Sequence, residues 1–153
     1  PGICRAKHHP EGTIRLDMAA AMHRLGGISF KETGTRPGTY RFDADRMTRE
    51  IGDIVLARRD IGTSYHLAVV VDDAAQGISE VTRGEDLFDA TAIHVVLQRL
   101  LGLPTPTYHH HRLIRDEQGK RLAKRDDARA LSKYRDEGAT PADIRRMVGL
   151  PVR

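Results

Sequence analysis

The sequence is poor in aromatic residues and in cysteine, and it lacks a long hydrophobic run. Aromatic residues make up 5% of the 153 residues and tryptophan is absent, so we expect a core of Leu, Val, Ile, Ala and Met. The single cysteine, Cys4, excludes a disulfide within the chain and fits a reducing compartment, so we expect a cytoplasmic protein. No apolar run approaches the ~20 residues that a membrane helix needs, so we expect no membrane partner.

What the chain does contain is an ordinary globular composition with a small basic excess. Hydrophobic residues make up 39% and charged residues 30%, with a formal net charge of +4. This charge is compatible with a polyanionic partner such as RNA but does not select one. The first residues, Pro1 to Arg5, contain neither an initiator methionine nor the apolar segment of a signal peptide, so we interpret the chain as part of a longer protein.

Helices are predicted where a capping residue precedes an apolar periodic segment. The predicted helices are Met18–Leu25 between Asp17 and Gly26-Gly27, a segment from Asp89 or Thr91 to Gly102, and one that begins at Thr140 and Pro141.

Strands are predicted where short apolar or β-branched runs lie between polar residues. The predicted strands are Ile28–Glu32, Asp53–Arg58, Ile78–Thr82 and Tyr108–Ile114. Thr33–Tyr40, which contains Gly34, Pro37 and Gly38, is predicted to be a turn or loop. Tyr65–Ala75 fits a strand by its three consecutive valines and a helix by its apolar spacing. The order of elements predicts an α/β fold with a helical C-terminal tail.

Two segments have the composition of a ligand site. Gly119–Asp126 is a basic segment after a predicted strand, suited to the phosphates of a nucleotide triphosphate, although the segment by itself favours a solvated run of charge. Arg83 follows another predicted strand, where α/β sheets bind ligands, and its guanidinium suits a carboxylate. The alternative for Arg83 is a surface ion pair with Glu85 or Asp86.

Four segments together resemble the second catalytic half of the class I glutamyl-tRNA synthetase family. They are Tyr65–Asp73, Ile78–Asp86, Leu97–Pro104 and Arg121–Arg125, in that order. Within the family the chain is most similar to the shortened glutamyl-Q branch, which lacks an anticodon-binding domain and attaches glutamate to the queuosine base of tRNA(Asp). The resemblance implies a Rossmann-like fold, with residues 1–50 as a remnant of an inserted connective and zinc region, 51–126 as the second half of the catalytic domain, and 127–153 as a helical tail.

The resemblance also implies roles for individual residues. Tyr65 and Arg83 match positions that hold the glutamate substrate, and Arg121-Leu122-Ala123-Lys124-Arg125 matches the KMSKS-type loop that binds ATP. Lys124 is the residue that we expect to stabilise the activation transition state. The loop departs from the family signature because Arg121 replaces a lysine and Ala123 replaces a serine, which keeps the positive charge but removes a hydroxyl.

The implied substrates and partners are glutamate, ATP with Mg²⁺, and tRNA, with tRNA(Asp) favoured. The HIGH-type motif of the family is absent from this sequence, so we expect the chain alone to catalyse little or nothing. Cys4 matches the last ligand of the family's zinc site, but one cysteine cannot make a four-ligand site, so we expect no Zn²⁺ in this chain unless the upstream ligands are present.

Three other functions remain open from the sequence. They are a truncated glutamyl-tRNA synthetase that charges tRNA(Glu), a non-catalytic RNA-binding module, and a structural interaction domain. Three groups could suggest a metal site, and the sequence favours a structural interpretation for each: His109 with His111, the Asp72-Asp73 pair, and Cys4 with His8 and His9.

Overall fold

The computed structural model describes residues 12–60, 62–116, 118–122 and 130–152. The chain divides into two compact units, residues 1–111 and residues 112–153, and each is considered by itself. The sequence-based division at residues 50 and 126 stays a prediction. Of the predicted site residues, Cys4, Ala123, Lys124 and Arg125 lie outside the described residues.

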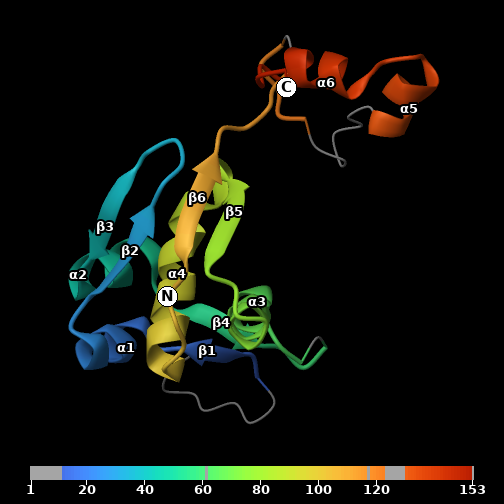
Figure 1. Cartoon of the computed structure of the whole chain (residues 1–153). Helices are drawn as coiled ribbons and strands as arrows, with labels where there is room; N and C mark the ends of the chain where they lie inside the picture. Colours follow the sequence, from blue (N-terminus) through green and yellow to red (C-terminus); the bar gives the residue numbers. More distant parts are fainter. Residues whose placement is uncertain (1–11, 61, 117, 123–129, 153) are drawn as a thin grey trace. The chain divides into compact units, whose positions relative to one another are not determined.

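The first unit is built on a four-stranded sheet in the order β3-β2-β6-β5 (Figure 1). The strands are β2 (Ile28–Glu32), β3 (Gly38–Phe42), β5 (Glu80–Gly84) and β6 (Thr107–His111). The β2–β3 pair is an antiparallel hairpin, whereas β2 and β5 both run parallel to β6. A parallel arrangement of this kind agrees with the α/β class expected from the sequence.

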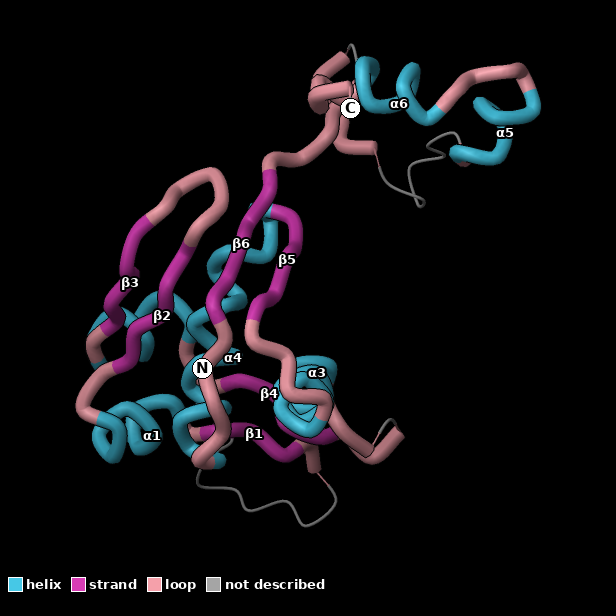
Figure 2. Tube along the Cα trace, viewed as in Figure 1, coloured by secondary structure: helices cyan, strands magenta, loops and turns pink. Residues whose placement is uncertain are grey.

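Helices cover one face of this sheet and a smaller sheet lies beside them (Figure 2). Helix α4 (Phe88–Leu101) packs against β2, and both α1 (Met18–Leu25) and α3 (Tyr65–Ala75) pack against α4. Strands β1 (Ile14–Leu16) and β4 (Ile54–Ala57) form the second, antiparallel sheet. Three short turns complete the unit: α2 (Ala44–Arg46), a π-helical turn (Met47–Ile51) and a 3₁₀ turn (Glu85–Leu87). None of the described helices has the length and hydrophobicity that a bilayer crossing requires.

The core of the first unit consists mainly of the Leu, Val, Ile, Ala and Met side chains expected from the sequence, and aromatic rings add to it. All three phenylalanines of the chain are buried and lie within 6 Å of one another or of a tyrosine ring: Phe30 stacks on Phe42 at 5.9 Å and meets Phe88 and Tyr108 edge-on. The few aromatic residues are therefore concentrated between the sheet and α4. Each ring buries a large apolar area, so a few rings contribute substantially to the core.

Most predicted elements are confirmed, and the misplacements have local reasons. Asp17 caps α1, and Gly26 ends it in a left-handed conformation. The ambiguous segment Tyr65–Ala75 is a helix, because the Ser64 side chain accepts a hydrogen bond from Leu67 N at 3.3 Å and begins it. The prediction of a loop over Thr33–Tyr40 is wrong for its second half, since β3 begins at Gly38, and the strand predicted at Ile78 begins two residues later.

The second unit contains two short helices, α5 (Leu131–Asp136) and α6 (Pro141–Met147). Thr140 and Asp143 form a capping box at the start of α6, as the sequence predicted for Thr140 and Pro141. This box, with the Arg146 side chain, lowers the pKa of Asp143 to about 2. The predicted turn at Asp116–Gly119 is also present, because Gly119 N donates to the Asp116 carbonyl oxygen at 2.9 Å.

Candidate active site

Arg83 lies at the carboxyl end of β5 and is the centre of a polar cluster in the first unit. Its Nε donates to His110 Nε2 at 3.2 Å, its Nη1 lies 3.2 Å from His94 Nδ1, and its Nη2 donates to Thr91 Oγ1. The guanidinium carbon also lies 5.2 Å from the centre of the Tyr108 ring. Burial lowers the pKa of Arg83. None of the three partners is a carboxylate, so none of them carries a negative charge to match the guanidinium.

The alternative of a surface ion pair between Arg83 and Glu85 or Asp86 is not what the structure describes. The three side chains that contact the guanidinium come from β6 and from the first turns of α4. Arg83 is held by the interior of the unit and is half-buried.

The buried carboxylate of Glu32 contacts His110, which in turn contacts Arg83. Glu32, the last residue of β2, is 2% exposed and accepts a hydrogen bond from His110 N at 3.0 Å and from Gly34 N at 2.6 Å. Its second oxygen lies 2.5 Å from His110 Nδ1. Burial alone would raise the pKa of Glu32, but the bonds from His110 and Gly34 outweigh it and lower the pKa, so the side chain is ionised.

Two further histidines extend the cluster toward the surface. His94 Nε2 lies 3.0 Å from His66 Nδ1, at the start of α3. Burial, with the adjacent Arg83 charge, lowers the pKa of His94 to about 3, and the same two causes lower the pKa of His66. Both rings are therefore neutral at pH 7.

Tyr65, the other residue predicted to hold glutamate, stands at the outer edge of this cluster. Its ring centre lies 5.7 Å from that of His66 and 6.1 Å from that of His94, and the side chain is 63% exposed. The fold thus brings Tyr65 and Arg83 to the two ends of one chain of contacts, with the histidines between them.

The predicted ATP loop belongs to the second unit, and two of its five residues are described. Arg121 pairs with Arg115 in an antiparallel bridge, and Leu122 N donates to the Ile114 carbonyl oxygen at 2.9 Å. The Asp116 side chain accepts from Lys120 N at 2.7 Å and so holds the turn that leads into the loop.

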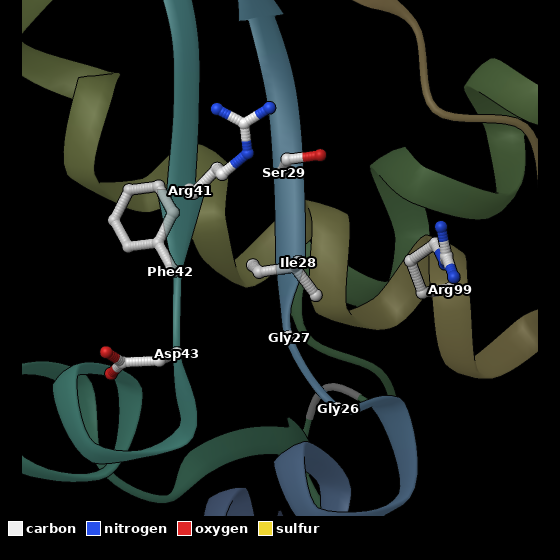
Figure 3. A pocket seen from close by; sticks show the side chains of 8 residues that line it. All are labelled: Gly26, Gly27, Ile28, Ser29, Arg41, Phe42, Asp43 and Arg99. Atoms are coloured by element: carbon white, nitrogen blue, oxygen red, sulfur yellow. The ribbon is translucent and has the colours of Figure 1, made fainter.

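A shallow hollow of about 380 Å³ lies elsewhere in the first unit (Figure 3). It is lined by the start of β2, by Arg41 and Asp43 near the end of β3, and by Arg99 of α4. This is the end of the sheet where the parallel strand β2 begins, whereas Arg83 lies where β5 ends. Ligands of parallel α/β sheets bind beyond the carboxyl ends of the strands, which favours the Arg83 cluster as the site.

The described residues hold no group of three or more metal-ligating side chains. His109 faces away from His110 and its Nδ1 lies 3.1 Å from Thr33 Oγ1. Asp72 and Asp73 lie in the later turns of α3.

The sequence did not single out Glu32, Thr91, His94 or His110. One signal was available for His110: along β6 it alternates with Tyr108, and an apolar ring two residues away indicates the buried face of a strand. The other three residues lie in segments that carry no motif, and only the fold brings them to Arg83.

Residues 38–151 match the family described as tRNA synthetases class I (E and Q), catalytic domain. The chain is also similar to curated proteins named glutamyl-Q tRNA(Asp) synthetase. That from Rhodobacter capsulatus is 61% identical over 98% of this chain and 56% of the relative, and that from Albidiferax ferrireducens is 49% identical over 99% and 53%. The chain therefore spans about half the length of these curated relatives.

Two solved structures resemble the fold. A glutamate-tRNA synthetase from Elizabethkingia anophelis matches 75% of this chain with a TM-score of 0.53 and 28% identity, and the match covers 21% of that protein. A glutamate tRNA ligase from Elizabethkingia meningosepticum, solved in complex with its amino acid, matches equally well over 20% of its length.

Proposed function

This chain belongs to the class I tRNA synthetases for glutamate and glutamine, which are ligases, and from that premise we propose that it supplies the second half of a catalytic domain that activates glutamate with ATP. The activated glutamate is then transferred to tRNA, and the names of the relatives favour the queuosine base of tRNA(Asp) as the acceptor. The observation that carries the proposal is the environment of Arg83 at the carboxyl end of β5.

Arg83 retains the donors that a carboxylate needs. A guanidinium has five N–H groups, and three of them are used by His110, His94 and Thr91. Among the described residues this leaves one N–H on each terminal nitrogen, the number that a bidentate carboxylate takes. Its positive charge, met directly only by neutral acceptors, also favours an anionic ligand.

The remaining roles are proposed from the resemblance of these segments to the family. Tyr65 lines the entrance to the glutamate site, and the basic loop, with Arg121 and Lys124, binds the phosphates of ATP. When an oxygen of the α-carboxylate of glutamate attacks the α-phosphate, the bond to the β-phosphate breaks and pyrophosphate leaves. Lys124 and Arg121 neutralise the charge that develops on it. We propose that Mg²⁺ accompanies ATP, since this ion is usually bound through substrate phosphates together with one or two carboxylates.

A charging assay tests this function. The chain is fused to the part of the Rhodobacter capsulatus relative that it does not match, and the fusion is given labelled glutamate, MgATP and one of three acceptors: tRNA(Asp) with queuosine, the same tRNA without it, or tRNA(Glu). We expect label only on the tRNA that carries queuosine. Label on tRNA(Glu) instead would identify a glutamyl-tRNA synthetase, the function named for the two solved neighbours.

Arg83→Lys in the fusion tests the residue assignment, with Arg41→Lys as the matched control on the exposed face of β3. Lysine keeps the charge but loses the planar fork, so we expect the KM for glutamate to rise by about tenfold or more. The control variant is expected to behave like the parent. An unchanged KM in Arg83→Lys would remove Arg83 from the glutamate site.

A further inference from the structure

Glu32 and His110 form a buried pair that the proposed chemistry does not use directly. They are 2% and 0% exposed, and neither reaches the surface where a substrate would bind. Burying an ionised carboxylate is costly unless each oxygen is hydrogen-bonded, and both oxygens of Glu32 are. An apolar pair at these positions would avoid that cost, so the pair calls for a role beyond packing.

The contacts determine where the protons of the pair lie. Ionised Glu32 can only accept, so His110 carries its proton on Nδ1 and donates it to Glu32. His110 Nε2 is then an acceptor, which is what the Nε–H of Arg83 requires, since arginine only donates. The charge of Glu32 therefore fixes the tautomer of His110, and the tautomer fixes the direction in which Arg83 points.

The same reasoning applies to His94. Its Nδ1 faces Arg83 Nη1 and must accept, so its proton lies on Nε2 and is donated to His66 Nδ1. Arg83 thus meets two histidine acceptors, and of these two only His110 has its tautomer set by a buried charge.

We propose that Glu32, acting through His110, is a positioning residue for Arg83: it holds the guanidinium in the orientation that leaves its two free N–H groups for the substrate carboxylate. The proposal rests on the role proposed above for Arg83. Glu32 and His110 do not touch the substrate, so their effect is on the affinity for glutamate, with a smaller effect on turnover.

The first test is made on the 153-residue chain by NMR and does not depend on activity. Glu32→Gln keeps the shape of the side chain, but its amide donates toward His110 Nδ1 and forces the proton to Nε2. In the parent chain, we expect ¹⁵N spectra of the histidine rings to show His110 as the Nδ1–H tautomer. In the variant we expect the Nε2–H tautomer, together with a displaced or broadened Arg83 Nε–H signal. The control, Glu80→Gln, removes an exposed carboxylate from β5 and should change neither signal.

A second variant separates positioning from folding. An asparagine amide overlays Nδ1 of histidine but does not reach the Nε2 position, so His110→Asn keeps the bond to Glu32 and removes the acceptor of Arg83. We expect this variant to retain the fold while the Arg83 Nε–H signal moves. Unchanged Arg83 signals in both variants would overturn the proposal.

The kinetic test uses the fusion enzyme. For Glu32→Gln and His110→Asn, we expect the KM for glutamate to rise about tenfold or more, while kcat and the KM for ATP change by less than about threefold. Equal loss of kcat in both variants with unchanged KM would also overturn the proposal. If the parent fusion charges no tRNA, the proposed function has failed, and the NMR test still decides whether Glu32 positions Arg83.

Discussion

Arg83 is a cation whose guanidinium contacts no carboxylate among the described residues. Its guanidinium is half-buried, yet two neutral histidines and a threonine take the positions that carboxylates usually occupy around a buried arginine. Burial, together with the adjacent positive charge of Arg83, opposes protonation of His94 and His66 and lowers the pKa of both. These histidines should therefore make the stability of the chain depend on pH.

We expect the free energy of unfolding to fall as the pH drops below about 6.5, the ordinary pKa of histidine. In the unfolded chain His94 binds a proton near this pH, whereas in the folded chain its pKa is about 3, so between these values the unfolded state binds more protons and is favoured. The lowered pKa of Glu32 acts in the same direction below 4.5. For His94 alone the fall approaches roughly 1.4 kcal/mol per pH unit.

Urea unfolding of the parent and of His94→Gln at about pH 7 and about pH 5 measures this effect. The variant should lose less stability between the two conditions than the parent does. His23→Gln, which changes an exposed histidine of α1, serves as the control and should keep the pH dependence of the parent. An equal loss of unfolding free energy between the two pH values in the parent and in His94→Gln would contradict the expectation.

At the scale of elements, the connection between β2 and β3 holds the cluster together. Gly34 lies against the backbone of β6, and a Cβ at this position would stand 2.1 Å from the His110 carbonyl oxygen. The close approach lets Gly34 N donate to Glu32, and nearby Thr35 N donates to the His110 carbonyl oxygen at 2.9 Å. Glycine is needed here for space, since its φ is outside the left-handed region.

Gly34→Ala is expected to lower the free energy of unfolding by roughly 1–3 kcal/mol, because the backbone of β6 cannot move away cheaply. Gly77→Ala is the comparison: Gly77 has a φ of 67° but open space around it, so its substitution costs about 1–2 kcal/mol of conformational strain. Denaturation curves of both variants and of the parent measure the two losses of unfolding free energy. A smaller loss for Gly34→Ala than for Gly77→Ala would show that the contact is loose.

Sequence patterns predicted elements better than they predicted the cluster, for a physical reason. Caps such as Asp17 and Thr140 act on backbone groups within three residues, so a local pattern contains all the information. β3 was missed because Pro37 and Gly38 indicate a turn. The strand forms because it pairs with β2, and the local sequence of residues 33–40 does not reveal that pairing. The surroundings of Arg83 come from residues 32, 91, 94 and 110, whose proximity follows only from the sheet order and from the packing of α4.

At the scale of the whole molecule, β5 forms one edge of the four-stranded sheet. Among the described strands it pairs with β6 alone and so ends the sheet on one side. The chain spans about half the length of its curated relatives, so this edge is where we expect the sheet of a complete enzyme to continue. An unpaired parallel edge also invites pairing between copies.

We therefore expect the 153-residue chain to sediment as a dimer or larger species at high concentration. Thr82→Lys places a charge on β5 and should shift it toward the monomer, whereas Thr39→Lys on β3, the other edge of the sheet, should not. Analytical ultracentrifugation of the three proteins makes the comparison. A parent chain that is monomeric at high concentration would show that β5 is not a pairing surface.

If Arg83 holds the side-chain carboxylate of glutamate, in line with its proposed role, the acceptors around it also explain how the site would distinguish an acid from its amide. Glutamine has the shape of glutamate, but its amide nitrogen would bring N–H groups against the N–H groups of Arg83, and its side chain carries no charge to match the guanidinium. Because His110, His94 and Thr91 already occupy the other donors, Arg83 cannot turn to meet the amide without breaking bonds that hold it. Under this proposal, rejection of the neutral analogue would depend on the buried side chains around Arg83 as much as on Arg83 itself.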